Sequence, residues 1–459
     1  MDVQPEPEPT PADPSRRTFL QVTGLGAAGL ALSPLLAACR SSSSGGGGGS
    51  SPAASAAGSA AASTATAGTI KIGFVSPRTG PAAGFGEPDG YVLGLARQAF
   101  ASGVEVGGKR YAVEIIDKDG QSNPQRGAQV ANDLIHGSNV DVMLTTSTPE
   151  TVNPVSDACE AAGVPCISTV VPWEAWYFGR GAKPGKPSPF KYTYHFCFGV
   201  QQFANAYTTM WPQVPTNKKV GVMWPNDADG NAIRASLGPL LKKAGYTIVD
   251  PGAYADGTND YSSQIALFKK TDCQIFNTFP IPPDFATFWH QAAQQGYKPK
   301  IAQIAKTGLF PSQVTSLGTI GQNLASAEYW GPTWPYTSTL TNVSSANLAS
   351  GYESASGKQW NMQLGPSLAL FDVANAVLKG VQDPKDKQAV AAAMATLSVD
   401  TVIGKLQWGK GPVANVVATP IIGGQWVKAT SGKFPLDFVV CENSNDPNVP
   451  VAAKLQPYS

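Results

Sequence analysis

The sequence contains little histidine and little charge. Three histidines occur, at positions 136, 195 and 290, and no two of them have the spacing of metal ligands. Charged residues make up 14% of the 459 residues, with 33 Lys and Arg against 32 Asp and Glu, and neither sign forms a run. The composition therefore argues against a metal centre, a nucleic acid partner and a strongly charged substrate.

Catalytic and nucleotide-binding motifs are also lacking. The segment 103–109 has the spacing of a P-loop, but Arg110 stands where a Ser or Thr would hold magnesium. A similar spacing at 404–410 is followed by Gly411. The G-x-S-x-G nucleophile elbow does not occur. We predict neither an enzyme nor a bound cofactor.

The N-terminal segment carries two export signals in order. SRRTFL at 15–20 matches the twin-arginine pattern, and a mildly apolar stretch at 19–38 leads into LAAC at 36–39, a lipobox. A transmembrane anchor is the alternative, but glycines, polar residues and a proline make this stretch a poor span. We predict a signal peptide at 1–39, export by the twin-arginine route, and lipid on Cys39 that anchors the protein on the extracytoplasmic face of the cell membrane.

The segment 40–68 follows as a linker. It consists almost wholly of Ser, Gly, Ala and Thr, with a run of glycines at 45–49. Such a composition cannot bury apolar surface and is typical of a flexible tether, with an r.m.s. span of about 30 Å for this length. A tether of this kind would let a globular body reach both a solute and a membrane partner.

Cysteine usage leaves two interpretations open. Six cysteines are present, and with Cys39 reserved for lipid the remaining five cannot all pair. Cys159 and Cys166 flank a predicted helix-to-strand turn, where they could meet in a disulfide, or both could be small buried apolar side chains. Folding in a reducing cytosol before export favours the second interpretation.

From residue 69 onward, strand and helix patterns alternate. Short apolar runs predict strands at 70–75, 111–116, 140–145, 164–169, 219–224, 246–249, 273–279 and 300–304. Amphipathic patterns predict helices at 88–101, 124–136, 150–162, 230–244, 261–270, 284–295, 346–356 and 366–380. This order predicts an α/β protein with parallel sheets flanked by helices on both faces.

The two series of strands and helices predict two Rossmann-like lobes. We place the first lobe at 69–198 plus about 333–402, and the second at about 199–332 plus 403–459. A chain that crosses between lobes more than once makes a hinge, and ligands of such proteins bind in the cleft at the carboxyl ends of the strands.

Several short motifs, in a fixed order, resemble one known family. They are IKIGFVSPRTGP at 70–81, DKDG at 117–120 with NP at 123–124, NPVSD at 153–157, GVP at 163–165, KKVGV at 218–222 and DGTNDY at 256–261. Together they resemble the leucine/isoleucine/valine-binding receptors of ABC transporters, which have the type I periplasmic-binding-protein fold.

The resemblance implies a function and partners. Two lobes would close by a hinge on a small-molecule solute, and the receptor would deliver it to an ABC permease with separate ATPase subunits. A ligand-sensing receptor of the same fold without transport is the alternative, and an extracytoplasmic enzyme on this scaffold is a third possibility.

The resemblance also places candidate ligand contacts in the first lobe. Hydroxyls and backbone N–H groups after the strand at 140–145 would hold a carboxylate at a helix N-terminus, although plain helix capping would use the same residues. The loop at 76–85 supplies an aromatic ring, and the loop after 164–169 lies beside it. The candidates are Thr79, Phe85, Thr146, Ser147, Thr148, Val170 and Trp173.

In the second lobe the candidates are Trp224, Asn226, Asp227, Phe279 and Lys306. Family members hold a ligand's ammonium with an acidic side chain near the end of the strand at 300–304, where this chain has Lys306. A buried lysine would repel an ammonium, so we predict a carboxylic acid or amide with an aromatic or apolar body rather than a simple α-amino acid. The alternative is that Lys306 points to solvent while Asp227 or Asp229 replaces that acid.

Overall fold

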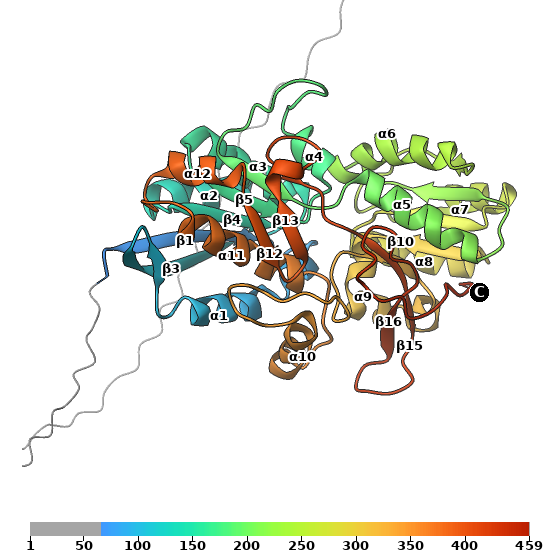
Figure 1. Ribbon diagram of the computed structural model, residues 1–459. Helices are drawn as coiled ribbons and strands as arrows, with labels where there is room; N and C mark the ends of the chain where they lie inside the picture. Colours follow the sequence, from blue (N-terminus) through green and yellow to red (C-terminus); the bar gives the residue numbers. More distant parts are fainter. Residues whose placement is uncertain (1–65, 459) are drawn as a thin grey trace, which may run out of the picture. The chain divides into compact units, whose positions relative to one another are not determined.

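The computed structural model describes residues 66–458. The predicted signal peptide, Cys39 and most of the linker lie outside these residues. All of the described residues belong to one compact unit. Two seven-stranded sheets run through this unit, each flanked by helices (Figure 1).

The first sheet has the strand order β14-β6-β5-β4-β1-β3-β2. All neighbours are parallel except β2 and β3, which are antiparallel. Its strands are β1 (Thr69–Ser76), β2 (Val104–Val106), β3 (Lys109–Asp119), β4 (Val142–Thr146), β5 (Cys166–Thr169), β6 (Thr193–Phe196) and β14 (Val416–Val417). The central strands β4, β5 and β6 are buried along their whole length, as expected for a parallel sheet covered on both faces.

The second sheet has the order β16-β15-β11-β10-β9-β7-β8. The strands from β11 to β8 are parallel, and β15 and β16 add an antiparallel edge. They are β7 (Lys219–Met223), β8 (Thr247–Val249), β9 (Ile275–Thr278), β10 (Ile301–Ile304), β11 (Ala325–Glu328), β15 (Ile422–Lys428) and β16 (Leu436–Val440). A separate hairpin joins β12 (Ser398–Thr401) and β13 (Gly404–Gln407).

Helices cover both sheets. In the first lobe, α2 packs against α3, and α11 packs against α1 and the strands β4 and β5 (Figure 1). In the second lobe, α5 packs against α6, and α7 against α8. The helices are α1 (Asp89–Ala99), α2 (Pro124–Asn132), α3 (Pro149–Ala162), α4 (Trp173–Tyr177), α5 (Val200–Met210), α6 (Ala228–Lys243), α7 (Ser262–Lys270), α8 (Pro282–Gln294), α9 (Pro311–Ser316), α10 (Ser345–Ser356), α11 (Leu364–Lys379) and α12 (Lys387–Met394).

Local sequence explains where two of these helices begin and end. Asn123 caps α2, because its side chain accepts the N–H of Arg126 at 2.9 Å, and Pro124 occupies the first helical position. Helix α3 ends at Gly163, whose φ of 67° is the left-handed conformation that favours glycine. The predicted helix at 124–136 is divided: α2 stops at Asn132, and a π-helical turn covers Asp133–Gly137.

The chain passes between the two sheets three times. We call these segments the interlobe passages: residues 197–199 after β6, residues 329–344 after β11, and residues 418–421 before β15. The predicted lobe boundaries stay a prediction. We note that β14 pairs with β6 in the first sheet, although residues 403–459 were predicted for the second lobe.

Buried thiols complete the interior. Cys159, Cys166, Cys197, Cys273 and Cys441 are all buried and free, so the structure has Cys159 and Cys166 as packed apolar side chains. Within residues 66–458, no helix has the length and apolarity needed to cross a bilayer.

Candidate functional site

A pocket lies between the strand ends of the two sheets. Its cavity volume is about 30 Å³, well below the roughly 300–1,000 Å³ of small-molecule sites, so the walls must move apart to admit a ligand much larger than water. Both lobes and all three interlobe passages contribute to it. Its lining residues are Phe85, Thr148, Val170, Pro172, Phe198, Phe203, Asp229, Phe279, Ala305, Lys306, Leu309, Ala327, Tyr329 and Ile421.

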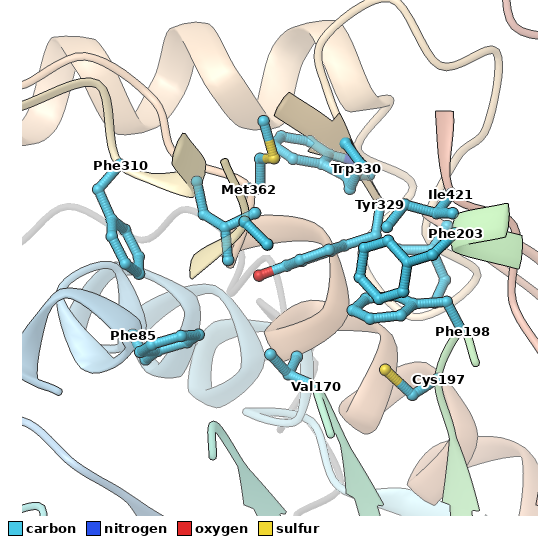
Figure 2. Close-up of a cluster of buried hydrophobic side chains, with 14 of the residues drawn as sticks. Phe85, Val170, Cys197, Phe198, Phe203, Phe310, Tyr329, Trp330, Met362 and Ile421 are labelled. Atoms are coloured by element: carbon cyan, nitrogen blue, oxygen red, sulfur yellow. The ribbon is translucent and has the colours of Figure 1, made fainter. Parts of the chain in front are cut away.

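Apolar side chains form most of the wall, and five of the fourteen lining residues are aromatic; Figure 2 shows four of these rings, Phe85, Phe198, Phe203 and Tyr329. Phe198 stacks on Tyr329, with ring centroids 5.3 Å apart and planes at 28°. Phe203 meets Phe198 edge-on at 5.0 Å and Phe279 edge-on at 5.1 Å. Phe85 lies on the side of the first lobe. The pocket is therefore shaped for a flat or branched apolar body.

Phe85 is itself held by a ring of the second lobe. Its centroid lies 4.9 Å from that of Phe310, and the two planes meet at 82°. This edge-on pair brings the loop after β1 against the segment that follows β10.

The first turn of α3 supplies polar groups on the first-lobe side. Thr148 occupies the N-cap position and lines the pocket, but its side chain makes no capping hydrogen bond. Just before this helix, the hydroxyls of Thr145, Thr146 and Ser147 are buried and have no hydrogen-bond partner in the described part of the chain. Because buried hydroxyls normally find partners, a row of unpartnered ones at a helix N-terminus is suited to an anionic ligand group.

Lys306 dominates the second-lobe side of the pocket. Its Nζ lies 2.7 Å from Asp227 Oδ2 and 3.1 Å from Asp229 Oδ2, and all three side chains are at least nine-tenths buried. Burial alone would lower the pKa of Lys306, but the carboxylates of Asp229 and Asp227 raise it well above its usual value. The lysine is therefore a cation paired with two carboxyl groups.

Asp229 keeps one oxygen free. Its Oδ2 contacts Lys306, while Oδ1 is buried without a hydrogen-bond partner, and the residue lines the pocket. Burial raises the pKa of Asp229 to about 7, and the attraction of Lys306 only partly opposes this. A ligand that donates a hydrogen bond to Oδ1 would satisfy this group.

Backbone strain gathers around the pocket. Ser147 has φ of 124° directly after β4, Val170 has φ of 67° directly after β5, and Lys306 has φ of 45° just after β10. Positive φ is rare for residues other than glycine and is a clear outlier for a β-branched valine. Strained residues of this kind persist where the surroundings hold them, and they cluster at ligand sites.

Comparison with known proteins identifies the family. Residues 69–430 match the family model described as periplasmic binding protein. The chain belongs to the periplasmic binding proteins. Members of this family bind solutes and are not enzymes. This periplasmic binding protein is 24% identical over 354 residues to Leu/Ile/Val-binding protein homolog 7 of Brucella suis biovar 1, covering 74% of this chain and 84% of that one.

Two solved structures show the fold. The branched-chain amino acid transporter substrate binding protein LivJ of Streptococcus pneumoniae, in complex with isoleucine, has a TM-score of 0.63 at 17% identity, covering 81% of this chain and 99% of that one. A solute binding protein of an ABC transporter from Rhodopseudomonas palustris BisB5, in complex with 3,4-dihydroxybenzoic acid, has a TM-score of 0.65 at 18% identity. The match covers 83% of this chain and 99% of that one. The predicted α/β fold with two lobes and the resemblance to the Leu/Ile/Val-binding group are confirmed.

The pocket of this periplasmic binding protein includes part of the predicted set. Phe85, Thr148, Val170, Phe279 and Lys306 line it. Lys306 is buried there and does not point to solvent. Their roles as ligand contacts stay a prediction.

Three further predicted residues lie just outside the lining. Ser147 and Thr146 precede Thr148 along the chain, and both hydroxyls are buried. Asp227 stands behind Lys306: its Oδ1 accepts the N–H of Gly230 at 2.6 Å, which caps α6. These residues support the pocket wall.

The remaining predicted residues lie elsewhere. Thr79 is exposed and its hydroxyl donates to Asp119 Oδ2 at 2.7 Å. Trp173 packs against Tyr177 and Phe178. Asn226 is exposed at the start of the loop before α6.

Trp224 lies inside the second lobe. The residue is buried, and its indole N–H donates to Asn277 Oδ1 at 2.9 Å. It ends the strand that we predicted, but its side chain faces the core and not the pocket.

Nine lining residues were absent from the predicted set: Pro172, Phe198, Phe203, Asp229, Ala305, Leu309, Ala327, Tyr329 and Ile421. Three of them belong to or adjoin the interlobe passages, which carry no local motif. A search for aromatic residues at the predicted crossing near 192–198 would have found Phe198, but also Tyr192, Tyr194 and Phe196, which do not line the pocket. In residues 66–458, no group of three or more His, Cys, Asp or Glu side chains is placed to hold a metal ion.

Proposed function

We propose that this protein is an exported, lipid-anchored receptor that captures a small aromatic carboxylic acid, or an amide of similar size, and hands it to an ABC permease. The observation that carries the proposal is the pocket itself. Thr148 at the N-cap of α3 lines one side, directly after the buried hydroxyls of Thr146 and Ser147, which have no hydrogen-bond partner among residues 66–458, and five aromatic rings line the rest.

The start of α3 is the proposed seat of the carboxylate. Thr148 lines the pocket there, and the buried hydroxyl of Ser147 precedes it without a partner. The helix dipole and the free N–H groups of the first turn add attraction for an anion. A carboxylate bound there would supply the hydrogen bonds that these groups lack.

The ligand's ring would lie among Phe85, Phe198, Phe203, Phe279 and Tyr329. A hydroxyl or N–H group on it would donate to Oδ1 of Asp229, which has no hydrogen-bond partner among residues 66–458. The Rhodopseudomonas palustris protein with this fold holds 3,4-dihydroxybenzoic acid, a ligand with a carboxylate, a ring and hydroxyl donors. That likeness supports the chemical class and not the individual compound.

Lys306 gives no reason to exclude an α-amino acid, because Asp227 and Asp229 offset the lysine charge in the cleft. The preference for an aromatic acid rests instead on the lining of the pocket.

Export and membrane anchoring rest on the sequence alone. The twin-arginine pattern at 15–20 and Cys39 support them. Delivery to a permease is supported by the family, whose Brucella and Streptococcus members are named for amino acid binding or transport.

Ligand binding is tested by thermal shift and calorimetry. The panel comprises benzoate, 3,4-dihydroxybenzoate, isoleucine and benzyl alcohol. A ligand at 100 times its Kd stabilises the folded state by about 2.7 kcal/mol, so aromatic acids are expected to raise the Tm clearly while benzyl alcohol, which lacks the carboxylate, does not. Thr148→Val should weaken benzoate binding, and Thr151→Val, a buried threonine outside the pocket lining, is the matched control.

Transport and anchoring need separate measurements. Uptake of the labelled acid should be lost when the gene is deleted, and Cys39→Ser should release the protein from membranes. If isoleucine stabilises the protein and neither aromatic acid does, the proposed ligand class is wrong. Retained uptake in the deletion strain would favour the sensing receptor.

A further inference from the structure

Each interlobe passage places one side chain in the pocket. Phe198 lies in the first passage, Tyr329 begins the second directly after β11, and Ile421 ends the third directly before β15. All three side chains are buried. The floor of the pocket is thus built from the segments that join the two lobes, and from neither lobe alone.

Two of these residues form a fixed aromatic pair. Phe198 and Tyr329 stack with centroids 5.3 Å apart. The hydroxyl of Tyr329 accepts a hydrogen bond from Nε2 of Gln363, a buried residue at the N-cap of α11. The tyrosine is therefore held at its ring by Phe198 and at its hydroxyl by the first lobe.

The surroundings leave the pair little room to move. Phe203 packs edge-on against Phe198 at 5.0 Å. In Figure 2 the Tyr329 ring lies between the Phe85 and Phe310 side of the cluster and the Phe198 and Phe203 side. Interiors packed in this way respond to a change of a single methylene group.

We infer that the Phe198–Tyr329 pair is a length gauge that limits the ligand to a short, single-ring carboxylic acid. This inference rests on the proposed function. The proposed carboxylate seat at Thr148 and the pair on the interlobe passages line the same pocket, so a ligand held at Thr148 would meet the pair as its length increases. Since the pair is tied to both lobes, it cannot retreat from a longer ligand without disturbing the connection between them.

A ligand series of increasing length tests the gauge. Benzoate, phenylacetate and 3-phenylpropionate share a carboxylate and a ring and differ only in their spacer. One methylene too many in a closed apolar pocket typically weakens binding by about 10–200-fold. We expect the wild-type Kd to rise sharply at one step along this series.

Replacing either ring with a smaller side chain should remove this sharp rise in Kd. Tyr329→Leu and Phe198→Leu are expected to shift the ratio of the 3-phenylpropionate Kd to the benzoate Kd toward the longer acid by at least about tenfold. Tyr329→Phe keeps the ring but removes the hydrogen bond with Gln363, so it should shift the ratio less than either leucine variant. Either leucine variant suffices if the other does not fold.

The matched control is Phe276→Leu. Phe276 stacks on Phe288 at 4.8 Å in the core of the second lobe and does not line the pocket. It should lower stability without changing the ratio, because a purely structural loss affects all ligands of the series alike.

The outcomes separate the two proposals. If the acids bind but both leucine variants keep the wild-type ratio, or if Phe276→Leu shifts it equally, the length gauge is refuted while the proposed function stands. If no acid of the series binds the wild-type protein, the proposed ligand class fails and the gauge fails with it.

Discussion

The ammonium of Lys306 lies 2.7 Å from the carboxylate of Asp227. The same carboxylate caps α6 through the N–H of Gly230. Lys306 follows β10 and Asp227 follows β7, so this ion pair joins two strand ends of the second sheet at the wall of the pocket. Lys306 therefore stabilises the wall of the pocket, and its charge is already paired before a ligand binds.

Removing this lysine should destabilise the protein strongly. Lys306→Met leaves Asp227 and Asp229 buried and without their cation, and breaking a buried ion pair costs about 3–5 kcal/mol. Urea unfolding at pH 7.5 measures the loss. Lys405→Met is the control, because its contact with Asp400 is 3.6 Å long and exposed, and exposed pairs contribute about 0–1 kcal/mol. Equal losses in the two variants would contradict this interpretation.

Glu328 should make stability depend on pH. Burial raises the pKa of Glu328 from 4.5 to about 8, and the hydrogen bond from Trp334 opposes this only in part. Because the folded pKa lies above the unfolded one, the stabilising contribution is complete below pH 4.5 and is lost as the pH rises to 8.

The test compares wild type with Glu328→Gln by urea unfolding between pH 5 and pH 8.5. The glutamine keeps an acceptor for Trp334 and carries no charge, so the variant should lose less stability over this range. Glu105→Gln at an exposed position is the control and should follow the wild type. Parallel pH profiles for Glu328→Gln and wild type would show that Glu328 does not titrate as expected.

Ser147→Gly should raise the unfolding free energy and weaken the binding of a carboxylate ligand. Ser147 combines a φ of 124° with a buried hydroxyl that has no partner. Glycine removes both costs but adds freedom to the unfolded chain, so we expect a net gain of about 1 kcal/mol in unfolding free energy. The lost hydroxyl should weaken carboxylate binding by about tenfold.

Calorimetry and urea unfolding of the same preparation measure both effects. Asn342→Gly, at a φ of 55° that asparagine tolerates, is the control and should change neither quantity much. A variant that is both less stable and unchanged in affinity would show that Ser147 is neither strained nor a ligand contact.

Trp224→Phe should affect stability alone. The indole N–H donates to Asn277 Oδ1 in the core, and the phenylalanine leaves that oxygen unsatisfied at a cost of about 1–3 kcal/mol. The ligand Kd should stay within about twofold, because Trp224 does not line the pocket. Phe279→Leu, which alters the lining, should change the Kd. If Trp224→Phe lowers the affinity for the ligand and leaves stability unchanged, Trp224 is a ligand contact after all.

Much of the fold followed from local patterns. The runs at 70–75 and 219–224 predicted β1 and β7, because a strand buried on both faces of a parallel sheet must be apolar along its length. Asn123 and Pro124 marked the start of α2 for an equally local reason, since capping uses groups within one turn.

Other elements depend on distant partners. Strand β11 has the sequence ASAE, which carries no strand pattern, and we did not predict it. It is ordered by β10 on one side and β15 on the other. The same holds for β14, a two-residue strand that exists through its pairing with β6.

The candidate site also combines residues that local sequence predicted with residues whose position depends on distant partners. Phe85, Thr148, Val170 and Phe279 were found because residues after parallel strands face one edge of a sheet. Trp224 follows the same rule by position, but its side chain turned to the core, where Asn277 could bond its N–H. The position of Trp224 in the sequence predicted where its backbone lies, but it did not predict the direction of its side chain.

The amino-acid sequence by itself determined the family, the alternation of strands and helices and the loops that carry the pocket, because these are set by local periodicity, capping and short motifs. Only the tertiary structure decided that Lys306 is neutralised by Asp227 and Asp229, and that Phe198, Tyr329 and Ile421 meet in one pocket. Their meeting depends on three passages far apart in the chain, and packing between such segments has no signature in any one of them.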